Sequence, residues 1–110
     1  MAYDEDLAER VRGLVSVRDK ITEKRMFGSD CFLVGGNLAV CVRQDELLVR
    51  LDPPDAERAI TEKGVRVAEM GPQKRQMKGW VFVSAEHLSD DGLSEWVDAG
   101  ADYAASLAPK

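Results

Sequence analysis

The chain has 110 residues, of which 45% are hydrophobic and 32% are charged, and its formal net charge is −5. This length supports one hydrophobic core, so we expect a single domain over residues 1–110. The sequence contains no apolar run near the roughly 20 residues that cross a bilayer, and its acidic balance argues against bulk neutralisation of nucleic-acid phosphates. Membrane spanning is therefore excluded, and we expect any role at DNA to be indirect rather than through direct DNA binding.

The N-terminal segment predicts a helix and a cytoplasmic location. It is acidic from Asp4 to Asp6, where a signal peptide would be basic and then apolar. Asp4 is suited to an N-cap, and apolar residues follow at helical spacing, which predicts a helix over about 5–18. In the cytoplasm the two cysteines are expected to be reduced.

Four β-type segments follow this helix and are separated by short turn sequences. We predict strands over 22–27, 31–34, 38–42 and 47–51, with turn residues at 28–30, 35–37 and 44–46 between them. Because links this short join antiparallel strands, consecutive strands should be neighbours in one sheet.

A short helix and two further strands come next. Asp52 and Pro53 begin the helix, which Gly64 ends. Strands are predicted over 65–70 and 80–84, joined by a polar loop over 71–78.

The last helix begins near Ser89 and ends before Pro109, with a broad apolar stripe along one side. Because the strands cluster rather than alternate strictly with helices, the predicted fold class is α+β. We expect a single antiparallel sheet packed with the N- and C-terminal helices, in the order helix, three or four strands, helix, two strands, helix.

The first strand carries four consecutive polar or charged residues, from Thr22 to Arg25. Such a run is costly in a buried strand and tolerable at a sheet edge, so its simplest interpretation is protection of an edge by charge. The functional interpretation makes Glu23, Lys24 and Arg25 part of a partner-binding face. Gly28 would then supply a turn with positive φ.

A second basic cluster lies in the predicted loop, which carries Lys74, Arg75 and Lys78. Loops held by a rigid sheet often carry function, although a solvated loop without a partner is the commoner case. Trp80 follows directly and is expected to be a core residue rather than a platform for stacking bases.

Cys31 and Cys41 lie on consecutive predicted strands. A three-residue loop at 35–37 would place them opposite one another, whereas a two-residue loop would not. We expect buried, inert thiols, since free cysteine usually behaves as a small hydrophobic residue.

The sequence carries no pattern that indicates catalysis or a bound cofactor. Two cysteines ten residues apart and a single histidine, His87, do not form a zinc site, and no nucleophile or phosphate-loop motif surrounds them. We therefore expect a protein that is not an enzyme and has neither metal nor cofactor.

The final helix places Trp96 on its apolar stripe, with the small residue Gly100 one turn later. Packing against the sheet explains this arrangement. If the stripe is wider than the sheet can cover, its remainder would form a homodimer contact.

Two short motifs carry a family resemblance. Residues 22–28 read Thr-Glu-Lys-Arg-Met-Phe-Gly, and residues 77–80 read Met-Lys-Gly-Trp, ahead of a last helix that contains Trp96. With the acidic first helix and a Leu-Val-Arg strand, they resemble the N-terminal domain of the TfoX/Sxy family, a bacterial competence-regulator family, from Tyr3 to about Leu107. The resemblance implies the same α+β arrangement.

The same resemblance implies a function. Proteins of that family promote expression of competence genes together with the cyclic-AMP receptor protein, and full-length members add a C-terminal helical domain. We expect a single-domain member without that second domain. What carries over is a docking surface, at the matching positions Lys24, Arg25, Met26, Phe27, Gly28, Met77, Lys78, Gly79 and Trp80.

We therefore expect a non-enzymatic regulatory or protein-interaction domain, a transcription co-regulator that contacts the transcription machinery or a regulator. One alternative is a small-molecule-binding module whose pocket lies between the sheet and the last helix, near Trp80 and Trp96. The other is an accessory protein of nucleic-acid modification.

Overall fold

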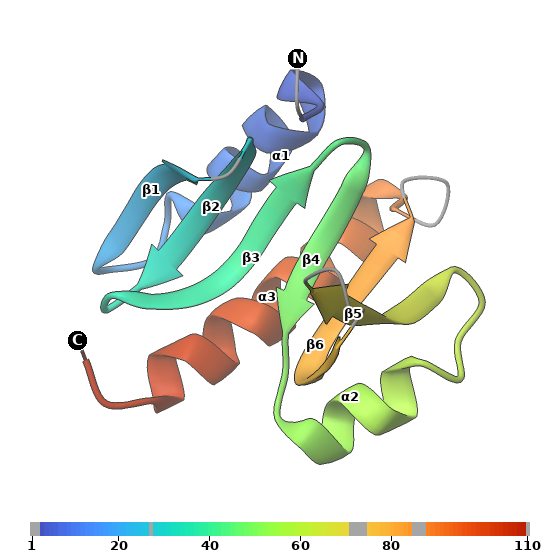
Figure 1. Cartoon of the computed structure of the whole chain (residues 1–110). Helices are drawn as coiled ribbons and strands as arrows, with labels where there is room; N and C mark the ends of the chain where they lie inside the picture. The colour runs from blue at the N-terminus through green and yellow to red at the C-terminus, as the bar shows by residue number, and fades with distance from the viewer. Residues whose placement is uncertain (1–2, 27, 71–74, 85–87, 110) are drawn as a thin grey trace.

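Figure 1 shows the computed structural model of the chain, which describes residues 3–26, 28–70, 75–84 and 88–109, with residues 70, 75–78 and 90 described through their backbone alone. Its helices and strands confirm an α+β fold in the predicted order. They are α1 (Glu5–Val15), β1 (Ile21–Met26), β2 (Ser29–Val34), β3 (Asn37–Arg43), β4 (Glu46–Arg50), α2 (Pro53–Ala59), β5 (Val65–Met70), β6 (Arg75–Ser84) and α3 (Asp90–Ser106).

The strands form one six-stranded antiparallel sheet in the order β1-β2-β3-β4-β6-β5. The first four strands are consecutive neighbours because each link between them is a short turn. After α2 the chain returns so that β6, rather than β5, pairs with β4. As a result, β1 and β5 are the two outermost strands.

One face of the sheet packs against the helices and holds the main core. Phe32, Val40, Val49 and Val81 are successive register partners across β2, β3, β4 and β6, and each is at most 1% exposed. Helix α3 crosses β2, β3 and β4 on this face, α1 packs against α3, and α2 packs against β6. Figure 1 shows α1 and α3 behind the sheet. We call this side the helix face.

The neighbouring row of residues points to the opposite face. Cys31, Cys41, Leu48 and Phe82 are register partners in this row, and Cys31, Cys41 and Phe82 are 4–5% exposed. The guanidinium groups of Arg43 and Arg66 lie over the Phe82 ring, 5.7 and 4.8 Å from its centroid. Residues of two adjacent rows therefore alternate between the faces, as strand geometry requires.

Several predicted boundaries are wrong. The short helix that Gly64 was predicted to end stops at Ala59, because the Ile60 N–H makes the last i→i−4 hydrogen bond, to the Ala56 carbonyl. Strand β2 begins at Ser29, two residues before the predicted strand.

The first helix ends at Val15 rather than at residue 18. Ser16 caps it there, and its backbone N–H donates a hydrogen bond to the Arg12 carbonyl. The predicted loop over 71–78 is shorter, because β6 begins at Arg75 and pairs there with Met70 of β5. Backbone hydrogen bonds extend this hairpin through a polar sequence, because they do not depend on side-chain polarity.

The link between β2 and β3 also differs from the prediction. Val34 pairs with Asn37, so the loop has only two residues, Gly35 and Gly36, at φ +60° and +84°. A register shift follows, and Ala39 is the extra residue of the resulting bulge. Cys31 and Cys41 are opposed after all, because the bulge adds the residue that the loop does not contain.

Within the described part of the chain, none of the helices is long and apolar enough to cross a membrane.

Candidate functional site

Strand β1 is the outermost strand on one side of the sheet, and it is the strand that carries the first motif. Its four residues from Thr22 to Arg25 are all exposed, which confirms the predicted edge position. Lys24 pairs with Cys31 and Arg25 with Asp30, so these two cations point to opposite faces of the sheet. Positive charge is therefore present on both sides of this edge.

Glu23 belongs to an ion-pair cluster that ties β1 to α1. The Arg12 guanidinium donates two parallel hydrogen bonds to the Glu23 carboxylate, each 2.7 Å long. The same guanidinium lies 3.5 Å from the Asp30 carboxylate of β2. Glu23 therefore makes a contact within the protein, because a bidentate pair of this kind fixes both side chains. Its partner-binding role stays a prediction.

Asp30 is the unusual member of this cluster. It is 0% exposed, and neither carboxylate oxygen accepts a hydrogen bond from the described residues, since the Arg12 contact is an ion pair without hydrogen-bond geometry. Burial, and then the neighbouring Glu23 carboxylate, raises the pKa of Asp30 from 3.8 to about 6. The hydrogen bonds from Arg12 lower the pKa of Glu23 from 4.5 to about 2.

These shifts predict how stability depends on pH. Because the folded state holds the Asp30 proton more tightly than the unfolded state, the free energy of unfolding should fall as pH rises from about 4 to about 6, by on the order of 3 kcal/mol at most from this group. Glu23 contributes stability above pH 4.5 that is lost as pH falls towards 2. The positive charges of Arg12 on α1 and Arg25 on β1 act in the opposite direction and lower the pKa of Asp30, but by less than burial and Glu23 raise it.

Asp30→Asn should therefore be as stable as wild type near pH 4.5 and more stable by about 1–3 kcal/mol near pH 7.5. Urea unfolding of both proteins at the two pH values measures the difference. An equal fall in stability for variant and wild type would show that Asp30 is not the group that titrates.

A shallow polar hollow of about 220 Å³ adjoins the cluster, between the start of α1 and β1. Arg25 and Arg12 line it together with residues of the N-terminal segment: Tyr3, Glu5, Ala8 and Glu9. Arg25 thus faces α1, whereas Lys24 faces the other way. Sequence patterns did not indicate this hollow, because its walls come from segments that are far apart in the sequence.

The second basic cluster lies elsewhere. Arg75 and Lys78 belong to β6, which is separated from β1 by β2, β3 and β4. Lys74 lies outside the described residues, as do Phe27 and His87. The backbone positions of the two basic clusters therefore do not form one edge.

Two glycines of the motifs, Gly28 and Gly79, hold backbone conformations with positive φ. Gly28 has φ +75°, as predicted, and Met26 is half-buried. Gly79 has φ +85°, and a Cβ there would lie 2.7 Å from the Leu51 carbonyl oxygen. Met77 is part of the β6 backbone. Gly28 and Gly79 therefore hold backbone conformations that glycine accommodates, and a larger residue at Gly79 would meet the backbone of Leu51.

The tryptophans are less buried than predicted. Trp80 is half-buried beneath the Arg50 guanidinium, which is 5.2 Å from the ring centroid and also lies near Tyr103. Trp96 is half-buried and packs at the margin of the core, because the centre of the α3 stripe consists of Leu93 and Val97.

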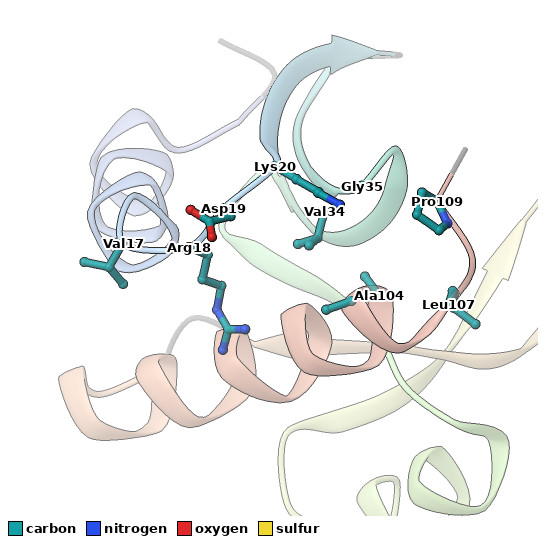
Figure 2. A pocket seen from close by; sticks show the side chains of 10 residues that line it. Val17, Arg18, Asp19, Lys20, Val34, Gly35, Ala104, Leu107 and Pro109 are labelled. Atoms are coloured by element: carbon teal, nitrogen blue, oxygen red, sulfur yellow. The ribbon is translucent and has the colours of Figure 1, made fainter.

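The hollows differ from the predicted pocket near both tryptophans. One of about 260 Å³ lies between α2 and the end of the sheet, with Trp80 but not Trp96 among its lining residues. Another, of about 410 Å³, is bounded by the segment after α1, the β2–β3 turn and the end of α3 (Figure 2). There Arg18 forms ion pairs with Asp98 and Asp102 of α3, at 3.2 and 2.9 Å.

Comparison with known proteins identifies the family to which the chain belongs. The family model of the TfoX N-terminal domain matches residues 13–104, which include both motifs and all six strands. No curated protein and no solved structure matches the chain. The match spans most of the sequence, and we conclude that this chain belongs to the TfoX N-terminal domain family.

Proposed function

We propose that this protein is a non-enzymatic protein-interaction domain that regulates transcription from the cytoplasm by binding a partner protein along β1. The observation that carries the proposal is the outermost position of β1, whose residues Thr22 to Arg25 are all exposed. One side of this strand has no neighbouring strand in the described sheet. Such an edge can accept an extended segment of another protein as an added strand.

The charges on β1 indicate what kind of segment would bind. Lys24 extends from one face of the edge and Arg25 from the other, whereas Glu23 is already paired with Arg12. An added strand with acidic residues on both of its faces would meet a positive charge on each side. We therefore propose an acidic segment of the transcription machinery, or of a regulator that acts with it, as the partner.

The rigid base of this edge supports the same proposal. The bidentate pair between Arg12 and Glu23 fastens β1 to α1, and β1 pairs with β2 along its whole length. An edge held in this way loses little conformational entropy on binding, which favours affinity.

Affinity capture from nuclease-treated lysate tests the proposal through the double variant Lys24→Glu/Arg25→Glu. We expect wild type to enrich a component of the transcription machinery or a transcription regulator. The variant should capture at least about tenfold less of it, because the side chains at positions 24 and 25 would then repel the acidic segment instead of attracting it. Mass spectrometry with labelled peptide standards measures the ratio.

Arg58→Glu/Lys63→Glu is the matched control, because both residues are exposed and lie in or just after α2, which packs on β6. Each double variant replaces two cations with carboxylates and so changes the net charge by four units, from −5 to −9. Equal loss of capture by the two variants would show that net charge, rather than β1, governs the interaction. Recovery of only the protein itself would replace the proposed partner with a second copy.

A second candidate function is a small-molecule-binding module, which the hollow beside Trp80 favours. Pro53, Ala56 and Ile60 line this hollow opposite Trp80, so it is largely apolar. A ligand bound there would change Trp80 fluorescence, whereas Trp80→Phe would remove that change and keep the binding.

A further inference from the structure

Cys31 and Cys41 form a pair of thiols in direct contact. They are register partners on β2 and β3, and the Cys41 Sγ donates a hydrogen bond to the Cys31 Sγ over 2.8 Å. Directly opposed residues of antiparallel strands have Cα atoms about 4.5 or 5.5 Å apart, and both values lie within the range that a disulfide spans. The backbone therefore already places these cysteines at bonding separation.

The pairing depends on one irregularity of the hairpin. With the register of Val34 and Asn37 continued along the strands, Cys31 would face Val40 instead of Cys41. The bulge at Ala39 shifts the register by one residue and so brings the sulfur atoms together. A hairpin without this bulge would place the two side chains on different faces.

We propose that Cys31 and Cys41 are a redox site that forms a reversible intramolecular disulfide, with hydrogen peroxide or a similarly small hydroperoxide as the oxidant. Both thiols are free in this structure. Closing the contact to a bond of about 2.05 Å shortens it by about 0.8 Å, which small rotations about two χ1 angles supply.

The roles of the two sulfur atoms follow from their surroundings. The hydrogen bond that Cys41 donates lowers the pKa of the Cys31 thiol and raises that of Cys41. Burial and the nearby Asp30 act against ionisation of Cys31, while Lys24 is its cross-strand neighbour on the same face at the exposed edge. Because the thiolate is the nucleophile, Cys31 is the attacking residue and Cys41 the resolving one.

The reaction balances in two steps. The Cys31 thiolate attacks one peroxide oxygen, the O–O bond breaks, and the leaving hydroxide takes a proton to give water and a Cys31 sulfenic acid. The Cys41 sulfur then attacks the Cys31 sulfur, the S–O bond breaks, and the departing hydroxyl leaves as water with the Cys41 proton. In sum, two thiols and one hydrogen peroxide give one disulfide and two waters, and a dithiol reductant reverses the change.

Thiol counting in the wild-type protein tests this proposal. The folded, reduced protein is treated with stoichiometric hydrogen peroxide, unfolded, alkylated and analysed by mass spectrometry. Alkyl groups are counted because the four methionines also gain oxygen. We expect the count to fall from two to none, a peptide joining residues 31 and 41 to appear, and dithiothreitol to restore both thiols.

Single variants test the assigned roles. In Cys41→Ser the Cys31 sulfenic acid should accumulate and be trapped by dimedone, at a rate about tenfold or more above that of Cys41 in Cys31→Ser. Two alkylated cysteines in peroxide-treated wild type, or disulfides only between molecules, would overturn the proposal. Faster trapping at Cys41 would overturn the assignment of Cys31.

Discussion

Replacing Gly100 with alanine is expected to lower the free energy of unfolding by about 1–3 kcal/mol, although alanine favours helix. A Cβ at this position would lie 2.7 Å from the Ala39 carbonyl oxygen and 2.9 Å from Val40 Cγ1. The first of these atoms belongs to the backbone of β3, so the conflict cannot be relieved by rotating a side chain. Helix α3 must therefore move away from the sheet.

Gly13→Ala is the matched control, because Gly13 also lies within a helix but has no atom within 4 Å of its Cβ position. This variant should be more stable than wild type by up to about 1 kcal/mol, since alanine reduces the backbone entropy that folding loses. Urea unfolding measures both variants. The same sign of change in the two proteins would contradict the close approach of α3 to β3.

The second large effect is expected at Phe32. Its side chain is 1% exposed and lies in the core row beside Val40, so Phe32→Ala should cost about 3–5 kcal/mol through lost burial and the cavity that remains. Trp96→Ala should cost less, because Trp96 is half-buried at the margin of the core. Chemical unfolding at one pH compares the two, and a loss at Phe32 below about 1 kcal/mol would mean that Phe32 is not buried beside Val40 as described.

The fold was largely predictable because its elements have local signals. Alternating apolar and polar residues, with turn residues between the runs, indicated the strands. The start of the first helix was indicated by its N-cap, Asp4, whose side chain accepts hydrogen bonds from the backbone N–H groups of Asp6 and Leu7. The pairing of β6 with β4 had no such signal, since it depends on how α2 packs. The end of α1 was misplaced because helical spacing of apolar residues continues beyond the last i→i−4 backbone hydrogen bond, from Ser16 to Arg12.

The candidate site was predictable only in part. Charge on β1 correctly indicated a sheet edge, but the cluster of Arg12, Glu23 and Asp30 joins three elements and leaves no local pattern. Asp30 in particular was treated as a turn residue, and it is buried because β2 begins at Ser29, two residues before the predicted strand.

The cysteine pair shows how one residue changes a prediction. Counting back from the two-residue glycine turn pairs Cys31 with Val40. The bulge at Ala39 shifts the register by one residue, so that Cys31 pairs with Cys41 instead. A bulge depends on packing across the whole sheet, here against α3, where Ala39 is 0% exposed. Local sequence does not determine where such a bulge will fall.

Hydrogen exchange of the captured complex tests the proposed binding edge most directly, because the sheet has two outermost strands that serve as internal comparison. We expect partner binding to slow exchange of backbone amides in β1, residues Ile21–Met26, by at least about tenfold, because an added strand accepts their outward N–H groups. Amides of β5, residues Val65–Met70, should exchange as in the free protein. Protection of β5 with unchanged exchange in β1 would contradict the account.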